Sequence, residues 1–362
     1  MKMSWQTYWR ELASGKRCEP GDKLLLFGLI PLAWLYSFIL RLRALLFQAG
    51  IMKTLRLPRP VVSIGNITVG GTGKTPTTAY IARLLLEQGY KVAVISRGYG
   101  GALEGQTSIV SDGATIMMSA RECGDEPYLL ASTLPGLMVV IGTDRNAAGL
   151  MAMQQLSPDI FLLDDGFQHL RLHRDLNILL LDYSLPFGNG WTLPAGMLRE
   201  PTSSVLRSDL VVFTRTPEEA VNPIGTQGIP VCLARHTLTD LLPLLGGAPL
   251  SFSDCRGKKM VACAGIADPE AFFTALRKQG LQLVQTFAYP DHVDYDTQRC
   301  AELAEALQAN GSDVLVTTEK DGVKLKGRAP EVAARTLLAR LELTIDKPDI
   351  LKGKLTELLQ HS

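Results

Sequence analysis

A glycine-rich segment of the chain has the residue types that bind phosphate. Residues 66–76 read Asn-Ile-Thr-Val-Gly-Gly-Thr-Gly-Lys-Thr-Pro and lie between an apolar run at 61–64 and a helical pattern. The backbone N–H groups of such a loop and the N-terminus of the following helix together form an anion site. In a Walker A loop, Lys74 contacts the β- and γ-phosphates and Thr75 gives its hydroxyl to magnesium.

This loop differs from the standard Walker A pattern in two places. Thr68 stands where the first glycine belongs, and the doubled glycine resembles variant loops that carry a further lysine at the position of Val69. An ordinary glycine-rich turn between a strand and a helix is the alternative. We predict a nucleotide-binding loop made of Thr68, Val69, Gly70, Gly71, Thr72, Gly73, Lys74 and Thr75.

Two carboxylates end an apolar run at 160–165, which reads Ile-Phe-Leu-Leu-Asp-Asp. Acids at the carboxyl end of a strand can hold magnesium directly or through water, as a Walker B element does. Asp164 and Asp165 are therefore candidates for the metal or phosphate site. The alternative is a capping role, because Asp165-Gly166 also fits a turn.

Polar side chains follow this run at Gln168, His169 and His173. The two histidines are four residues apart, as in some zinc sites, but no acidic or cysteine third ligand stands at the expected spacing. For Gln168 and His169 we favour contacts to substrate, or structural contacts, over a zinc site.

A second acidic group, Glu122, Asp125 and Glu126, occupies a segment that also contains glycine and proline. Such a concentration of negative charge needs a positive partner, for which a metal, Arg97 or a histidine would serve. One of these acids could act as general base toward a hydroxyl. A solvated acidic loop is the alternative.

Two further loops combine charge with glycine or proline. Arg97 and Tyr99 offer a guanidinium and an aromatic face for phosphate or sugar, although a plain glycine turn explains them too. Arg199 and Glu200 stand side by side. Glu200 could complete the oxygen shell of magnesium while Arg199 faces phosphate, or the two could form a surface salt bridge.

His292 is one of five histidines and follows a Tyr-Pro-Asp segment. If two domains close over the site, it could reach Asp125, although a lone loop histidine is more often solvated. The segment 318–321 reads Thr-Glu-Lys-Asp. It resembles the guanine-reading motif but lacks the spacer before the aspartate, so we favour ATP over GTP.

The elements that position these residues alternate between strands and helices. We predict strands at 61–64, 92–96, 138–142, 160–163, 178–182 and 210–214, with helices at 75–88 and 148–155. After an aperiodic linker at 217–230, a second set follows, with strands at 260–263, 283–287 and 314–317 and helices at 269–278 and 297–310. This order predicts an α/β, P-loop NTPase-like, mostly parallel sheet flanked by helices.

The N-terminal region contains an uncharged apolar stretch at 24–40. Its length of about 17 residues is short for a membrane-spanning helix, and Gly28 and Pro31 weaken a straight span, so it could instead lie in the interface. A buried core helix is a further alternative. Lys53, Arg56 and Arg59 follow and suit anionic lipid.

We therefore divide the chain into four parts. Residues 1–57 form a membrane-associated segment, 58–222 a P-loop nucleotide-binding kinase domain, 223–346 a smaller α/β domain that contributes to the cleft, and 347–362 a C-terminal tail. Lys and Arg (37) nearly balance Asp and Glu (36), so no global charge recruits nucleic acid. Six scattered cysteines without a C-x-x-C pair fit a reducing cytoplasm.

In their order along the chain, these motifs resemble the tetraacyldisaccharide 4′-kinase family of lipid A biosynthesis. The resemblance rests on segments 68–76, 96–100, 124–127, 164–169, 198–201, 290–292 and 318–321. It implies that the γ-phosphate of ATP, with Mg²⁺, is transferred to the 4′-hydroxyl of a lipid-linked glucosamine disaccharide 1-phosphate, giving lipid IVA. It also implies that Asp125 helps to deprotonate the hydroxyl with support from His292, and that Lys74 acts in catalysis.

The same resemblance implies a location at the cytoplasmic face of the bacterial inner membrane, with the bilayer and the lipid substrate as partners and no obligate protein partner. The alternative function is a membrane-associated ATPase switch of the doubled-glycine type. Val69 counts against that alternative, because such switches normally carry a lysine at this position.

Overall fold

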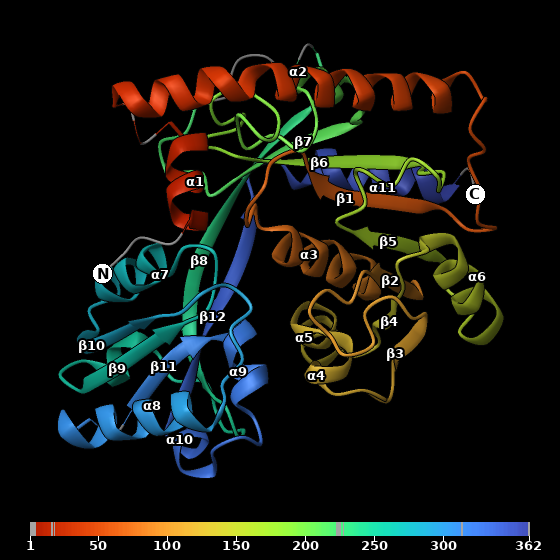
Figure 1. Cartoon of the computed structure of the whole chain (residues 1–362). Helices are drawn as coiled ribbons and strands as arrows, with labels where there is room; N and C mark the ends of the chain where they lie inside the picture. The colour runs from red at the N-terminus through yellow and green to blue at the C-terminus, as the bar shows by residue number, and fades with distance from the viewer. Residues whose placement is uncertain are drawn as a thin grey trace.

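The computed structural model of the chain describes residues 5–15, 17, 19–221, 226, 228–312 and 314–360. In these residues the strands form one continuous twelve-stranded sheet in the order β10-β9-β11-β12-β8-β7-β6-β1-β5-β2-β4-β3 (Figure 1). The strands are β1 (Val61–Asn66), β2 (Val92–Ser96), β3 (Ser108–Asp112), β4 (Met138–Ile141), β5 (Ile160–Asp164), β6 (Leu176–Asp182), β7 (Leu210–Thr214), β8 (Val231–Pro243), β9 (Lys259–Ala264), β10 (Gln282–Ala288), β11 (Val314–Thr318) and β12 (Thr336–Ile345).

The α-helices cover this sheet and extend beyond it. They are α1 (Trp5–Ala13), α2 (Pro20–Gln48), α3 (Lys74–Glu87), α4 (Ala120–Cys123), α5 (Asp125–Thr133), α6 (Arg145–Gln155), α7 (Pro269–Lys278), α8 (Thr297–Ala309), α9 (Glu319–Leu325), α10 (Pro330–Ala334) and α11 (Pro348–Gln360). The α/β class predicted from the sequence is confirmed, and β2, β7 and α7 have the predicted bounds.

Most neighbouring strands are parallel, and among the described strands the two antiparallel pairs are β3 with β4 and β8 with β12. The long strand β8 joins the two halves of the sheet. Its residues 231–233 pair in parallel with β7, and its residues 234–243 pair antiparallel with β12. The N-terminal half, β1 to β7, and the C-terminal half, β9 to β11, are therefore linked through β8 and β12.

Near-continuous apolar strands form the core of the N-terminal half, as expected for a sheet that is covered on both faces. Val62 and Ile64 of β1 pack with Ile81 and Leu85 of α3 on one face. Val61, the residue before Val62, belongs to the cluster that α6 covers on the other face. The alternation of side chains along a strand thus sets both layers.

Residues 348–360, for which the sequence suggested a tail, form helix α11. Leu351 and Leu355 lie on one face of it and are buried in the same cluster as Val62 and Ile64. In sequence this is a short segment with charged residues between its leucines, so its burial becomes evident only when the sheet lies beside it. The C-terminal helix therefore stabilises the N-terminal half.

Helix α2 runs along the outside of the molecule, across the top of the view in Figure 1. It is long and apolar enough to cross a membrane by length and composition, with a mean hydropathy of 1.9. One face is docked on the protein: Ser37 Oγ lies 2.8 Å from Thr192 Oγ1, and Arg43 Nη2 donates to the carbonyl of Gln168 at 3.3 Å. Apolar side chains on the rest of the helix are exposed, namely Leu24, Phe27, Leu32, Trp34, Leu35, Phe38, Ile39, Leu42 and Leu45.

Parallel strands bring the loops that follow them to one edge of the sheet. In the N-terminal half, the loops after β1, β2, β5 and β7 start there, and they carry the phosphate-binding loop, Arg97, Asp165 and Arg215. In the C-terminal half, the segment after β10 carries His292 and helix α9 follows β11 directly. These residues of both halves therefore lie in segments that follow strands.

Candidate active site

The glycine-rich loop follows β1 and leads into α3, which begins at Lys74, one residue earlier than predicted. Gly73 is the N-cap residue and has φ +75°. A Cβ atom at this position would lie 2.7 Å from Cε1 of His236, a residue of β8. Both the left-handed backbone and this close approach therefore require glycine.

Neighbouring segments hold the loop in place. The Val69 N–H donates to the Met197 carbonyl at 2.7 Å, and the Thr214 hydroxyl donates to the carbonyl of Thr72 at 3.0 Å. Gly71 approaches the C-terminal half, because a Cβ atom there would be 3.4 Å from that of Ala267. The eight residues predicted to bind nucleotide thus form one anchored loop at the junction of the two halves.

Asp165 is the centre of an ion-pair cluster at the start of α3. Arg199 binds it with two hydrogen bonds of 3.0 and 2.8 Å, and Lys74 Nζ lies 3.8 Å from its Oδ1. Burial raises the pKa of Asp165, but the Arg199 hydrogen bonds and the Lys74 charge outweigh burial and hold that pKa well below its usual range. Asp165 also has φ +55°, in the left-handed region that is costly for residues with a Cβ atom.

Asp164 has the opposite electrostatic character. Its carboxylate is buried and accepts a hydrogen bond from the Thr78 hydroxyl at 3.3 Å. Burial, together with the negative charges of Glu126 and Asp165, raises its pKa to about 7, although Lys74 and Arg145 oppose the shift. A buried carboxylate whose negative charge is so weakly balanced by neighbouring cationic side chains is suited to a position beside a bound cation. With Asp165 and the Thr75 hydroxyl it supplies the oxygen donors that magnesium prefers.

Glu200 makes a different contact from the one the sequence suggested. Its carboxylate is buried and forms an ion pair with Arg207, and the Arg207 guanidinium lies over the ring of Phe167 at 4.8 Å. Adjacent Arg199 turns to Asp165 instead. The two neighbours therefore do not pair with each other, and Glu200 would have to leave Arg207 to reach a metal.

Asn66, the last residue of β1, is a buried residue that the sequence reasoning did not assign to the site. Its carbonyl accepts hydrogen bonds from Gln168 Nε2 at 2.7 Å and from Arg199 Nη2 at 3.2 Å. Its side chain also contacts Arg199 and Thr68. The sequence signal that could have identified Asn66 is a polar residue at the carboxyl end of an apolar strand. Asn66 fixes the orientation of Arg199 and Gln168 beside the phosphate-binding loop.

Asp125 and His292 are brought together across the two halves. Nδ1 of His292 lies 3.3 Å from Oδ2 of Asp125, the contact that the sequence predicted on condition of domain closure. Tyr99 packs edge-on against the His292 ring with 5.2 Å between centroids. His292 has φ +60°, so this backbone, like that of Asp165, is held in a costly conformation.

The acidic segment is balanced by lysines of α9, which sequence reasoning did not identify. Lys324 Nζ lies 3.1 Å from Asp125 Oδ2, and Lys320 Nζ lies 3.4 Å from Glu126 Oε1. Arg97, one of the expected partners, instead pairs with Glu104 at 3.1 Å and has a side chain that is 60% exposed. The partner could not be read from the sequence because α9 is about 200 residues away and its lysines resemble any helical surface charge.

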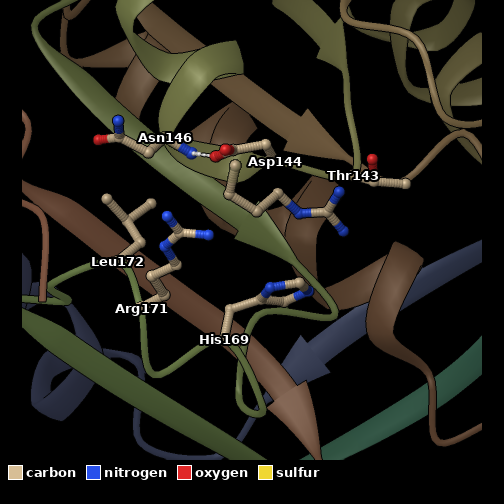
Figure 2. Close-up of a pocket in the computed structure, with 7 residues that line it drawn as sticks. Thr143, Asp144, Asn146, His169, Arg171 and Leu172 are labelled. Carbon is tan, nitrogen blue, oxygen red and sulfur yellow. Dashed lines mark hydrogen bonds between the residues drawn. The ribbon is translucent and has the colours of Figure 1, made fainter. Parts of the chain in front are cut away.

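His169 lines a polar pocket of about 250 Å³ with Thr143, Asp144, Arg145, Asn146, Arg171 and Leu172. Figure 2 shows His169, Arg171 and Leu172 on one side and Thr143, Asp144 and Asn146 on the other. Burial and then the charge of Arg145 lower the pKa of His169 to about 4, so its ring is neutral at pH 7. Burial lowers the pKa of Arg145 to about 10, which leaves this guanidinium charged. The pocket is therefore suited to an anionic group.

The chain is similar over most of its length to proteins of one family. Residues 25–360 match the model of a family described as Tetraacyldisaccharide-1-P 4'-kinase, or LpxK. A tetraacyldisaccharide 4'-kinase of Pelobacter propionicus is 60% identical over 99% of this chain and 100% of its own length. A Geobacter sulfurreducens protein of the same name is 55% identical over 89% of this chain and 91% of its own length.

The fold has a close counterpart among solved structures. A crystal structure of LpxK from Aquifex aeolicus in complex with ATP superposes with a TM-score of 0.80 and 34% sequence identity. The match covers 92% of this chain and 99% of that protein.

Proposed function

The chain belongs to the tetraacyldisaccharide-1-P 4'-kinase family, and from this premise we propose that it phosphorylates the 4′-hydroxyl of a tetraacyldisaccharide 1-phosphate with ATP, giving lipid IVA. The family match covers nearly the whole chain, and the charges of Lys74 and Glu126 both act on Asp164, which supports one site made of the phosphate-binding loop, the aspartates at the end of β5 and the Asp125–His292 pair. An ATPase switch needs no such acid–base pair opposite its nucleotide.

The contact between Asp125 and His292 carries this proposal. It supports a candidate base beside the phosphate-binding loop, because the charges of Glu126, the next residue, and of Lys74 are both near enough to Asp164 to shift the pKa of that carboxyl. A kinase needs this juxtaposition, since the acceptor hydroxyl must lose its proton next to the γ-phosphate.

In the reaction we propose, the protein mainly positions groups and neutralises charge. Asp125 accepts the proton of the 4′-hydroxyl, and His292 holds the Asp125 carboxylate in place. Lys74 and the N–H groups of residues 70–75 bind the phosphates, while Arg199 stabilises negative charge close to Asp165. Arg97, Tyr99, Gln168 and His169 contact the substrate or its phosphate.

Mg²⁺ fits the oxygen donors Thr75, Asp164 and Asp165, and it would neutralise charge on the nucleotide phosphates. Glu200 joins this set only if it releases Arg207. Asp165 is already bound by Arg199. We propose that this ion pair keeps both side chains in position beside the phosphate-binding loop.

We propose that the exposed apolar face of α2 lies in the membrane interface at the cytoplasmic face of the bacterial inner membrane. The exposed side chains recur every three to four residues, as in interfacial helices. The opposite side of α2 touches the loops that carry Gln168 and Arg199. A helix docked in this way would bring the membrane surface next to the loops that carry Gln168 and Arg199. Lys53 and Arg59 add positive charge for anionic headgroups.

We further propose that residues 58–222 and 223–346 act as two lobes that open and close on β8 and β12. Substrate entry would require opening, because Ala267 of the C-terminal half approaches Gly71 and His292 reaches Asp125 when the cleft is closed. Residues 222–225 of the expected linker lie outside the described residues.

Incubation of detergent-solubilised protein with γ-labelled ATP, Mg²⁺ and the disaccharide lipid tests the function. Labelled lipid is the expected product, and its formation should be lost in Lys74→Ala but retained in Lys91→Ala, an exposed lysine after α3. ATP hydrolysis without labelled lipid would favour the switch alternative.

A further inference from the structure

Lys324 of α9 is placed on the candidate base although nothing in its sequence context singles it out. Its Nζ lies 3.1 Å from Oδ2 of Asp125, and its side chain is only 8% exposed. A buried ammonium so close to a carboxylate interacts with it far more strongly than a surface pair does, because little water screens the charges.

Both partners of the Asp125 carboxylate bind the same oxygen. His292 Nδ1 lies 3.3 Å from Oδ2, and Lys324 Nζ approaches Oδ2 as well. No hydrogen bond or ion pair to Oδ1 is present within the described part of the chain. The carboxylate is therefore asymmetric: one oxygen holds the donors and the other is left to accept a proton.

The C-terminal half fixes Lys324 independently of Asp125. Its Nζ donates to the Val293 carbonyl at 3.0 Å, lies 3.5 Å from Asp321 Oδ1 and sits 5.8 Å from the centre of the Tyr295 ring. Asp321 is itself held by the Gly265 N–H and the Thr318 hydroxyl. The ammonium is thus positioned before it meets Asp125, and it arrives at the base only when the two halves meet.

A second lysine of α9 determines which nitrogen of His292 carries the proton. Lys320 Nζ lies 3.4 Å from Nε2 of His292 and also binds Asp291 at 3.2 Å. An ammonium has only donors, so Nε2 must accept and the proton of the neutral ring resides on Nδ1. The ring then donates through Nδ1 to Oδ2 of Asp125, the same oxygen that Lys324 contacts.

We propose that Lys324 is a positioning residue for the phosphoryl transfer, which holds Asp125 as a carboxylate through Oδ2 and leaves Oδ1 free to take the proton of the acceptor hydroxyl. In this step the hydroxyl O–H bond breaks and its proton passes to Oδ1. The hydroxyl oxygen bonds to the γ-phosphorus, and the bond to the bridging oxygen breaks to release ADP. The inference rests on the proposed function, in which Asp125 is the base.

The electrostatics around Asp125 agree with this role. Burial raises its pKa, whereas the His292 hydrogen bond and the charges of Lys324 and Lys320 lower it, and the net direction is downward. The charged and titratable groups around the site are Cys123 and Glu126 from the N-terminal half, and Asp291, His292, Lys320, Asp321 and Lys324 from the C-terminal half.

The test is the pH dependence of kcat/KM for lipid phosphorylation in full-length protein. In Lys324→Met the Asp125 pKa rises, so the acidic limb of the profile should move up by about one to three pH units, the usual effect of one neighbouring charge. Activity should recover toward the wild-type level above that limb. Lys324→Arg should keep the wild-type limb, and Lys326→Met, which removes an exposed lysine of the same segment, should match wild type throughout.

Lys324→Gln gives the same test with a side chain that keeps a donor but loses the charge, should the methionine variant fold poorly. If the neutral variants lose activity by one constant factor at every pH, Lys324 only supports the fold and the inference is wrong. If Asp125→Asn retains near wild-type activity, the base assignment itself fails. The two failures are therefore distinguishable.

Discussion

Nδ1 of His292 lies 3.3 Å from Oδ2 of Asp125, across 167 positions of the sequence. Asp125 starts α5 in the N-terminal half, and His292 follows β10 in the C-terminal half, so the contact exists only when the two halves meet. Four further polar contacts from α9 to residues 125, 126, 291 and 292 surround it. In the proposed reaction, a pair assembled in this way would couple proton transfer to the meeting of the two halves.

The first prediction is that Asp125 and His292 act as a unit. Asp125→Asn and His292→Ala should each lower kcat by roughly 10²–10⁴, the range typical of a lost acid–base group, and leave ATP affinity nearly intact. The double mutant should be little worse than the worse single mutant, because both residues serve one step. A loss equal to the product of the two single losses would instead make His292 a separate substrate contact.

The second prediction concerns the phosphate-binding loop. Lys74→Ala and Thr75→Ala should abolish most turnover while the melting temperature stays near that of wild type. Asp165 keeps its two hydrogen bonds to Arg199 when Lys74 is removed, so no carboxylate is left unpaired. Lys91→Ala is the exposed control. Wild-type turnover in Lys74→Ala would remove the loop from the active site.

The third prediction follows from the pKa of Asp164, which is raised from 3.8 to about 7. Just below pH 7 this carboxyl holds a proton, and a cation that arrives with the nucleotide favours the carboxylate, so binding of Mg²⁺ and ATP should release a proton. Calorimetric binding enthalpies should therefore vary with the ionisation enthalpy of the buffer. Asp164→Asn should remove that part of the dependence, and an unchanged buffer dependence in this variant would assign the proton elsewhere.

The raised pKa of Asp164 also makes the stability of the folded protein depend on pH. Because the folded-state pKa of Asp164 is raised, the folded protein binds this proton more tightly than the unfolded chain does. The stabilisation of the folded state by the protonated Asp164 carboxyl is fully present below pH 3.8 and is lost as the pH rises through about 7. We therefore expect Asp164→Asn to raise the melting temperature relative to wild type more above pH 7 than in acid.

The fourth prediction separates two roles of Glu200. Since its carboxylate pairs with Arg207, which packs on Phe167, Glu200→Gln should lower the melting temperature and leave the magnesium dependence of activity unchanged. Asp165→Asn should instead shift the magnesium titration. A shift for Glu200→Gln as well would restore the ligand role that the sequence suggested.

The fifth prediction concerns the exposed face of α2. Deleting residues 1–47 would also remove the contacts of Tyr36 and Arg43 to the site loops, so point substitutions test the membrane role more cleanly. Trp34→Ser with Phe38→Ser should reduce binding to anionic vesicles and activity on the lipid but spare ATP hydrolysis. Leu245→Ser, an apolar residue that is 59% exposed elsewhere, is the matched control. Equal losses in the two activities would argue for a role in folding.

Elements with local sequence signals could be predicted from the order of the amino acids alone. A glycine-rich loop between an apolar strand and a helix, and an apolar strand that ends in Asp164 and Asp165, are recognisable because neighbouring residues encode them. Strands β2 and β7, each flanked by turn residues, have the predicted bounds for the same reason. The same patterns predicted that the phosphate-binding loop, Arg97 and Asp165 follow strands, and parallel strands bring the loops that follow them to one edge of the sheet.

The tertiary structure decided which partner each charge takes. Glu200 selects Arg207 over adjacent Arg199, and the acidic segment is balanced by α9, because ion pairing depends on which elements fold side by side. The strands β8 and β12 mix buried and exposed positions without a clean period, so their long antiparallel pairing could not be foreseen. Helix α11 could likewise not be predicted from local sequence, because its two leucines are buried only against the sheet beside it. Local patterns specify backbone conformation, whereas charge partners and the burial of weakly patterned segments arise only when distant parts of the chain meet.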